Sequence, residues 1–179
     1  MKYYIKKTAS KNISVNRGIN LVGKIKEYVK KDKECLDLFK KYKKDIDLID
    51  DISISFDNNL EGSAKTINGR VYLNSKLAEK SFMILMRYVV HELVHVFQHM
   101  KGIKSDKKNN YLDIKEEEEA FAEQIKFDAK KRGVEKAEKY TEDLLEYHKY
   151  PKKKRESKFK KLTLRINRDK AKTNKSREK

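Results

Sequence analysis

The segment from Lys76 to Lys101 constrains the fold most, because it predicts one long helix with an almost continuously apolar middle. The apolar residues run from Phe82 to Val90. A helix that is apolar on most sides normally forms the buried centre of a domain. We therefore expect this helix to be the core element, with Gly102 as its C-terminal stop.

The residues before this helix predict helix first and sheet afterwards. Apolar positions recur at helical spacing from Ile19 to about Tyr42, which indicates one bent helix or two consecutive helices. The period then changes, since isoleucine and phenylalanine alternate with serine over 52–56, as in a half-buried strand. Two more short strands are expected over 63–67 and 71–73, joined by a tight turn at Asn68-Gly69.

The residues after the long helix predict two further helices. A polar loop is expected over 103–112, followed by a helix that Asp113 caps and that runs to Gly133. Another helix is expected from Val134 to about His148, ending before Pro151.

The two ends of the chain carry weaker patterns. Residues 1–17 are polar without a clear period, which is typical of a short strand or an arm. Beyond Pro151 we expect a mostly unstructured tail, in which the alternation of Leu162, Leu164 and Ile166 indicates a short strand.

Together these elements predict an α+β fold that is mainly helical, with a small antiparallel three-stranded sheet packed on the long helix. The chain has 179 residues, which suits one domain over 1–150 and a basic, flexible tail over 151–179. Only 37% of the residues are hydrophobic and 41% are charged, so the core is expected to be modest. The sequence has no internal repeat, Gly-rich phosphate loop or dinucleotide fingerprint.

Positive charge is concentrated in the tail. The net charge of the chain is +17, and residues 151–179 hold 14 Lys and Arg against 3 Asp and Glu. A block of like charge attracts polyanions, so nucleic acid is a candidate partner. The alternative is that the charge only keeps the protein soluble, because charge alone steers binding without specifying a partner.

The single cysteine and the lack of long apolar runs suggest where the protein works. Cys35 cannot form an internal disulfide, and its apolar neighbours predict a small core residue rather than a nucleophile. The N-terminus lacks the apolar run of a signal peptide, and no stretch approaches the length that spans a bilayer. We therefore expect a cytoplasmic monomer without membrane contact. The Lys, Asn and Ile bias suggests an AT-rich genome, bacterial or viral.

The motif His91-Glu92-Leu93-Val94-His95 carries the functional argument. Positions four apart lie one turn above another on a helix, so both imidazoles can bind one zinc ion, Zn2+. Glu92 is then placed to accept a proton from a water that the metal has made acidic, as a general base. The alternative is a pair of core histidines hydrogen-bonded to buried carboxylates, but burying these groups among valines would be costly without a purpose.

A third ligand is needed, because catalytic zinc sites usually have three protein ligands and one open position. His99 stands a further turn along the helix, which is far for the same ion, and we expect it at the surface or behind the ligands. The acidic run Glu116–Glu119 is the better source. Since consecutive helical residues point about 100° apart, only one or two of the four can face the metal. The others are expected to be solvated near the positive end of the helix dipole.

The motif HELVH followed by E-E-E-A-F-A resembles the gluzincin group of metallopeptidases, and the small ImmA/IrrE and SprT-like metallopeptidases in particular. The resemblance covers roughly residues 50–130 and is specific only at the motif. It implies helices packed on a short antiparallel sheet, and a glutamate ligand from a later helix, three positions before an alanine. Matched on Ala120, that ligand is Glu117.

The sequence departs from this family pattern at one position. Several gluzincin families place an aspartate after the alanine, where it supports a ligand histidine, but this chain has Phe121 there. Glu116 and Glu118 therefore stay open as alternative ligands.

Peptide hydrolysis also needs a group that stabilises the oxyanion and a surface that holds the substrate. Tyr140, Tyr147 and His148, on the last predicted helix, are candidates for the first role, although each also suits a core or surface position. The strand over 71–74 is a candidate edge for pairing with an extended substrate, although it also suits an ordinary hairpin strand.

Three functions are consistent with these residues. The first is a zinc metallopeptidase, with ligands His91, His95 and Glu117 and the general base Glu92, acting on a protein or peptide substrate. The second is a nucleic-acid-associated module, in which a zincin-like fold without peptidase activity supports the Lys-rich tail. The third is an inactive relative that binds a partner in the same cleft.

Overall fold

The structure is a computed structural model that describes residues 13–103 and 110–175. Its α-helices are α1 (Val15–Lys31), α2 (Lys33–Lys41), α3 (Leu48–Asp51), α4 (Phe82–Met100), α5 (Lys115–Arg132), α6 (Val134–Tyr147) and α7 (Lys152–Lys175). Its strands are β1 (Ile54–Asp57), β2 (Ala64–Ile67) and β3 (Arg70–Asn74), and its 3-10 helices are η1 (Ser75–Glu79) and η2 (Tyr111–Asp113). The predicted α+β class with a mainly helical content is confirmed.

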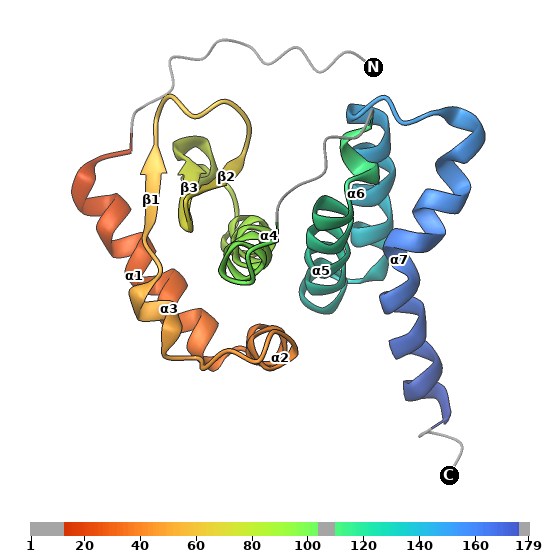
Figure 1. Cartoon of the computed structure of the whole chain (residues 1–179), viewed down its shortest axis with the longest axis horizontal. Coiled ribbons are helices and arrows are strands. Elements are labelled where there is room, and N and C mark those ends of the chain that lie inside the picture. The colour runs from red at the N-terminus through yellow and green to blue at the C-terminus, as the bar shows by residue number, and fades with distance from the viewer. Residues whose placement is uncertain (1–12, 104–109, 176–179) are drawn as a thin grey trace.

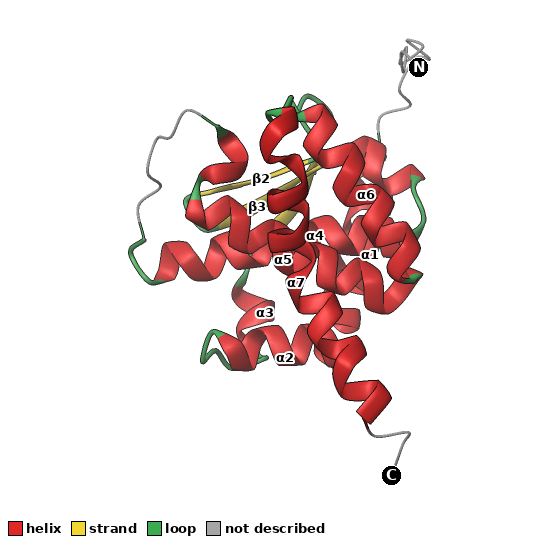
Figure 2. Cartoon of the chain, turned by 90° about the vertical axis from the view of Figure 1, so that its right-hand side faces the viewer, coloured by secondary structure: helices red, strands yellow, loops and turns green. Residues whose placement is uncertain are grey.

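Helix α4 lies at the centre, as its apolar sequence predicts. The sheet and α1 lie on one side of it, α5, α6 and α7 lie on the other, and α2 lies below it in this view (Figure 1). The same arrangement, turned by 90°, shows β2 and β3 behind the helical layer (Figure 2). Along the described residues, no helix combines the length and apolar character needed to cross a membrane.

The sheet is mixed rather than wholly antiparallel, which corrects the prediction from sequence. Its strand order is β1-β3-β2, so β3 is the central strand. Strand β2 pairs antiparallel with β3, across a turn in which Asn68 and Gly69 both have positive φ, as the sequence predicts. Strand β1 pairs parallel with the other edge of β3, with Ile54 opposite Val71. The alternating pattern predicted the strands but not this pairing, because both pairings present the same faces to the core.

Asp32 separates the first two helices, so of the two predicted alternatives the chain adopts the pair of consecutive helices. Its carboxylate accepts hydrogen bonds from the backbone N–H groups of Glu34 and Cys35 and thereby caps α2. Cys35 is fully buried, as expected for a core residue. Residues 1–12 of the predicted arm and residues 104–109 of the predicted polar loop lie outside the described residues.

One hydrophobic cluster, here called the first cluster, fills the space between α1, α2, the sheet and α4, and it also includes Ala120 and Phe127 of α5. Its largest fully buried members include Phe39, Phe97, Ile25, Leu73 and Leu93. The ring of Phe97 on α4 meets Phe39 edge to face, with the ring centroids 4.9 Å apart. The first cluster therefore fixes α4 against the N-terminal half of the chain.

A second hydrophobic cluster, here called the second cluster, joins η2, α5, α6 and α7. It includes Leu112, Ile125, Leu145, Leu162 and Ile166. The prediction of a mostly unstructured tail with a short strand is wrong for Lys152–Lys175, which forms α7. Leu162 and Ile166 are buried and four residues apart, so they share one helix face, whereas the intervening Leu164 is 45% exposed. Three alternating apolar residues could not distinguish the two-residue period of a strand from the 3.6-residue period of a helix.

Two predicted helix starts shift by a few residues. Helix α4 begins at Phe82 rather than Lys76, because η1 occupies the preceding residues. Ile114, not Asp113, is the N-cap position of α5. The Asp113 carboxylate instead accepts hydrogen bonds from Tyr150 and Lys158, which ties α5 to the C-terminal part of the chain.

Candidate metal centre

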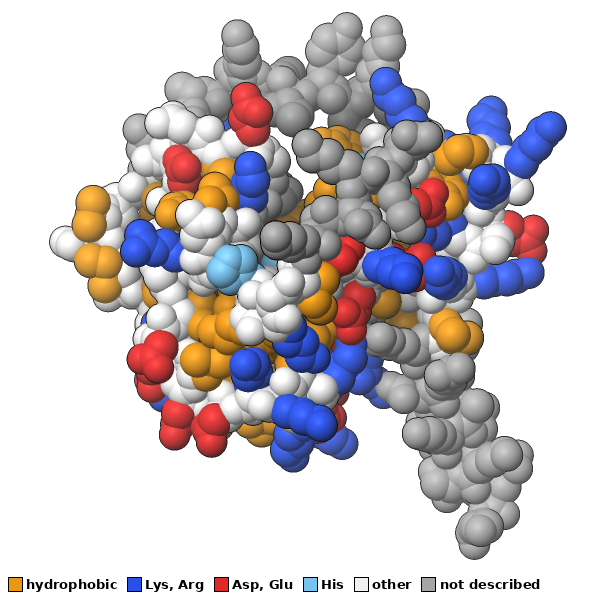
Figure 3. Space-filling view, in the orientation of Figure 1, with side chains coloured by type: hydrophobic (Ala, Val, Ile, Leu, Met, Phe, Trp, Pro, Cys, Tyr) orange, Lys and Arg blue, Asp and Glu red, His pale blue; other side chains and the backbone are white. Residues whose placement is uncertain are grey.

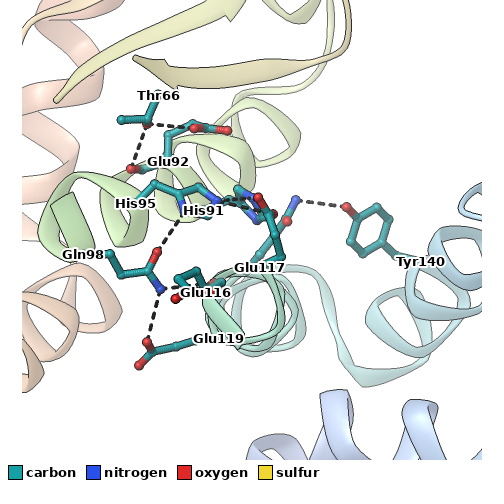
Figure 4. Close-up of polar contacts among 10 residues, drawn as sticks. Thr66, His91, Glu92, His95, Gln98, Glu116, Glu117, Glu119 and Tyr140 are labelled. Atoms are coloured by element: carbon teal, nitrogen blue, oxygen red, sulfur yellow. Dashed lines mark hydrogen bonds and ion pairs between the residues drawn. The ribbon is translucent and has the colours of Figure 1, made fainter. Parts of the chain in front are cut away.

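His91 and His95 project from the same side of α4, one turn apart, towards α5 (Figure 4). Their Nε2 atoms are 3.1 Å apart, and both rings are largely buried. At most one proton can lie between two nitrogens at this distance. At least one Nε2 therefore has its lone pair directed at its neighbour, either as the acceptor of a hydrogen bond or, if both nitrogens lack the proton, as a donor atom for a cation between them.

Glu117 of α5 brings a carboxylate to the same point. Its Oε2 atom lies 3.5 Å from Nε2 of His91 and 3.4 Å from Nε2 of His95. This oxygen is buried and has no hydrogen-bond partner in the described part of the chain. The three residues form a largely buried group that can hold a metal ion.

The charges of this group are coupled. Burial opposes ionisation of Glu117, but the imidazoles of His91 and His95, whose Nε2 atoms lie 3.5 and 3.4 Å from Oε2, outweigh it and hold the Glu117 pKa far below its usual value. Burial also opposes protonation of His95, yet Glu117 and then Glu92 raise its pKa. The group thus favours an anionic carboxylate beside a positive charge, and a metal cation can take the place of the proton.

Gln98 fixes which nitrogen of His95 faces the group. Its Nε2 donates to the backbone oxygen of Glu116 and to the Glu119 carboxylate, at 3.1 and 3.2 Å. The other end of the amide is therefore an oxygen, and it lies 2.9 Å from Nδ1 of His95. Nδ1 must carry the hydrogen, which leaves the Nε2 lone pair of His95 free to bind a metal.

His91 has no equivalent support. Its Nδ1 atom is buried and lacks a hydrogen-bond partner among the described residues. The ring of Phe121, at the position where the family pattern has an aspartate, packs against it with ring centroids 4.5 Å apart. The departure noted in the sequence thus leaves the Nδ1 side of His91 against an aromatic ring, without a hydrogen bond from a described residue.

The neighbours of Glu117 face other partners, as the 100° step of a helix requires. Glu118 binds two cations of α7, Lys158 and Lys161, each at 2.7 Å. Glu119 pairs with Lys41 of α2 and accepts from Gln98.

Glu116 is absent from the metal-binding group, although its backbone oxygen holds Gln98. The structure therefore places Glu117, and not Glu116 or Glu118, beside the imidazoles. His99 is exposed on α4 and also lies outside the group, as expected.

Glu92 turns towards the sheet rather than towards α5 (Figure 4). Its Oε2 accepts a 2.8 Å hydrogen bond from the hydroxyl of Thr66 on β2. The side chain lines the same cavity as His91 and His95, and its charge contributes to the raised pKa of His95. A buried carboxylate is thus held beside the metal-binding group by a residue of the sheet.

A cavity of about 1260 Å³ opens over these residues, between α4 and β2 on one side and η2, α5 and α6 on the other. The residues of β2 that line it are Ala64, Lys65 and Thr66. The strand over 71–74, considered from sequence as a candidate edge, is the central strand β3 and is paired on both sides. The edge strand beside the cavity is β2.

The three predicted candidates on α6 and after it have different surroundings. Tyr140 is partly buried in the cavity wall, and its hydroxyl accepts a hydrogen bond from Gln124 at 3.0 Å. Tyr147 is 79% exposed at the rim. His148 is partly buried and stacks on Tyr111, with ring centroids 5.0 Å apart and planes 18° apart. Burial lowers the pKa of His148, and the charge of His91 lowers it further, against the opposing effect of Glu117.

Tyr111 is the residue of this site that the sequence did not suggest. Burial and then the charge and hydrogen bonding of Glu117 raise the pKa of its phenol, so the hydroxyl stays protonated beside the metal-binding group. It precedes α5 in η2, within a region that the sequence predicts as a polar loop. No motif or period distinguishes it there.

The chain matches no protein-family model, no curated protein and no solved structure. Its function is therefore inferred from the geometry of this centre and its cavity.

Proposed function

We propose that the protein is a zinc-dependent metallopeptidase of the gluzincin kind, with His91, His95 and Glu117 as ligands and Glu92 as general base. The observation that carries this proposal is the spacing of the three ligand atoms, which lie 3.1, 3.4 and 3.5 Å apart. Ligand atoms about 2.0–2.1 Å from a tetrahedral zinc ion are separated by about 3.3–3.4 Å. Two imidazoles and one carboxylate are also a ligand set of catalytic zinc sites, which leave the fourth position open.

When bound, zinc acts as a Lewis acid and lowers the pKa of water at its open position. Glu92 then has the task of accepting a proton from the attacking water and passing it to the leaving amine. The hydrogen bond from Thr66 to one carboxylate oxygen holds Glu92 in place and leaves the other oxygen for the proton. A Glu92 carboxylate that was buried among apolar side chains, without this hydrogen bond, would not be held in position for proton transfer.

Two protonated or polar groups on the α5 and α6 side suit the negative charge that develops on the peptide carbonyl. The Tyr111 phenol stays protonated beside Glu117, and His148 stacks on it. Hydrogen-bond donors stabilise an oxyanion, and the Tyr111 hydroxyl can take this role when it turns from Glu117 to the peptide carbonyl.

The edge strand favours an extended peptide as substrate. In the described sheet β2 pairs only with β3, and its residues 64–66 line the cavity. An extended peptide can add to such an edge through main-chain hydrogen bonds. The reacting carbonyl would then lie near Glu92, because Thr66 connects the strand to that carboxylate.

The test compares Glu92→Gln with Glu146→Gln, a control that removes another carboxylate of the cavity wall. Zinc content, measured by inductively coupled plasma mass spectrometry, is expected near one ion per chain in both variants. Hydrolysis of a quenched fluorescent peptide library is expected to fall by about 10²–10⁴-fold in Glu92→Gln alone. Full turnover by Glu92→Gln contradicts the assigned role, and absence of bound zinc in the wild-type chain contradicts the whole proposal.

A second candidate function, binding of nucleic acid, is favoured by the structure of α7. Its first turn exposes Lys152, Lys153 and Lys154, and a further pair, Lys160 and Lys161, is also exposed. Basic side chains also gather on the side of the molecule where α7 lies (Figure 3). A helix of this charge can neutralise phosphates without reading sequence.

Removing α7 would be a poor test, because Leu162 and Ile166 belong to the second cluster. Changing Lys152, Lys153 and Lys154 to Gln keeps the helix and removes three charges. We expect weaker duplex DNA binding, with the slope of log affinity against log salt reduced by about 1 per lost phosphate contact. The charge-matched control changes three exposed lysines outside α7, Lys24, Lys31 and Lys33, to Gln. Equal losses in both triple variants would exclude a specific role for α7.

A further inference from the structure

A second polar cluster lies in the cavity wall, one helical turn before His91. Its central residue is Arg87, which lines the cavity although its side chain is only 10% exposed. The guanidinium lies over the ring of Tyr140, 3.8 Å from the ring centroid. It donates to the Tyr88 hydroxyl at 3.4 Å and reaches the Asp128 carboxylate through a single 3.5 Å contact. Its Nε atom is buried and has no hydrogen-bond partner within the described ranges.

The charges of this cluster do not balance. Asp128 is fully buried and is shared between Arg87 and Arg132, the latter at 3.2 Å. Two guanidinium groups and one carboxylate leave one positive charge. Arg132 is not part of the cavity lining, so the surplus charge faces the cavity through Arg87.

Gln124 adds a second incompletely bonded group at the same place. It is fully buried and lines the cavity, and its Nε2 donates to the Tyr140 hydroxyl at 3.0 Å, while its Oε1 has no partner among the residues described. A half-turn of the amide lets Tyr140 donate to Oε1 and releases an N–H donor. Gln124 and Arg87 can therefore both donate to one acceptor, and both contact Tyr140.

We infer that Arg87, with Gln124, forms a subsite for a carboxylate group of the ligand that occupies this cavity. A carboxylate supplies the missing acceptor oxygens and the missing negative charge at once. The exposed carboxylates of Asp143 and Glu146 also line the cavity, but they stand in water at its rim and are screened more strongly than buried Arg87.

The distance from the metal centre limits where the carboxylate sits in a substrate. One helical turn separates Arg87 from His91, which is about 5–6 Å along the axis. An extended peptide advances about 3.3–3.6 Å per residue. The carboxylate therefore lies one or two residues from the reacting bond, as the free C-terminus of a peptide or as an Asp or Glu side chain. This assignment to a substrate depends on the proposed peptidase function, whereas the binding site itself does not.

The experiment measures binding to the full chain carrying Glu92→Gln, so that no turnover occurs. Isothermal titration calorimetry compares N-acetyl-tetraalanine with a free C-terminus, its C-terminal amide, and the amide with glutamate in place of the last alanine. We expect the free acid or the glutamate peptide to bind at least about 10-fold more tightly than the plain amide. Tighter binding of the free acid identifies the C-terminus, and tighter binding of the glutamate peptide identifies a side chain.

Arg87→Gln, added to Glu92→Gln, is expected to abolish this preference and leave zinc binding unchanged. The matched control is Arg132→Gln, which removes the other partner of Asp128 and leaves the cavity lining intact. If Arg87→Gln does not fold, Arg87→Lys and Gln124→Leu replace it, and each should reduce the preference. A preference that survives in the folded variants, or that the wild-type Arg87 chain never shows, overturns the inference.

The outcome separates this inference from the proposed function. Hydrolysis of the free acid, the plain amide and the glutamate-containing amide at equal rates by the chain with Glu92 would reject the carboxylate subsite and keep the peptidase. Carboxylate binding that depends on Arg87, with no hydrolysis of any peptide, would keep the subsite and reject the peptidase.

Discussion

The two hydrophobic clusters contribute to the candidate metal centre in different ways. The first cluster holds α4, whose single turn carries His91, Glu92 and His95. The second cluster holds η2, α5 and α6, which contribute Glu117 and Tyr111. Two ligands are thus related by helix geometry alone, whereas the third depends on how the two clusters pack together. The distance of Glu117 from His91 and His95 therefore depends on how α5 packs against α4.

Several polar contacts fix this fit besides the packing of α4 on α5. Lys131 of α5 pairs with Asp32 in front of α2, and Gln98 of α4 holds the first turn of α5. The two clusters should therefore unfold together, and the following predictions examine that coupling.

The largest effect is expected from removing the centre of the first cluster. Phe97→Ala should cost about 3–5 kcal/mol of unfolding free energy, since the ring is fully buried between Phe39 and Tyr42. Leu162→Ala in the second cluster should cost about 2–5 kcal/mol. Urea unfolding followed by far-ultraviolet circular dichroism and by tyrosine fluorescence should give one coincident transition for each variant. Two separate transitions would show that the clusters fold independently.

Much of the fold could be predicted from sequence where local pattern decides it. The change of period between Tyr42 and Ile52, and the Asn68-Gly69 turn, correctly predicted helical structure followed by a hairpin, although the period left one bent helix or two helices open. The parallel pairing of β1 with β3 could not be predicted, because no local residue specifies which edge a strand takes. Helix α7 was missed, because its apolar positions are few and become informative only against Leu112 and Ile125 of the second cluster.

The site divides in the same way. HELVH indicated its two histidines because one turn of helix fixes their relation, and the structure places them together with Glu117. The choice of Glu117 within an acidic run came from a family resemblance, since the run itself allows its neighbours. The places of Tyr111 and Arg87 in the site depend on the packing of η2, α5 and α6 against α4. Composition and period therefore could not predict either residue.

An intermediate effect is expected at the tie between the clusters. Asp32 is buried, caps α2 and pairs with Lys131 at 2.5 Å. Asp32→Asn should therefore cost about 1–3 kcal/mol of unfolding free energy. The matched control is Asp50→Asn, whose exposed pair with Lys30 should contribute less than about 1 kcal/mol.

The pH dependence of the unfolding free energy tests the contribution of the Asp32 carboxylate. Burial alone would raise its pKa, but hydrogen bonds from Lys131 and Tyr28 outweigh burial and lower it. A carboxyl whose pKa is lower in the folded state contributes stability above its unfolded value of about 3.9, and this contribution is lost as the pH falls further. Urea unfolding between pH 6 and pH 3 should show a shallower loss of stability in Asp32→Asn than in the wild-type chain. Equal slopes would contradict the assignment.

The smallest effect concerns Gln98, which joins the two sides at the metal centre itself. Gln98→Ala removes the acceptor that keeps the hydrogen of His95 on Nδ1, and it also releases the backbone oxygen of Glu116. Metal affinity should fall by about 10–100-fold, as is typical when a group that orients a ligand histidine is lost. Competition with a chromophoric zinc chelator measures the change, and His99→Ala on the next turn should leave the affinity unaltered. If Gln98→Ala binds zinc as tightly as the wild-type chain, the orientation of His95 is set by the packing of α4 against α5, and the polar link between the clusters contributes nothing to the metal centre.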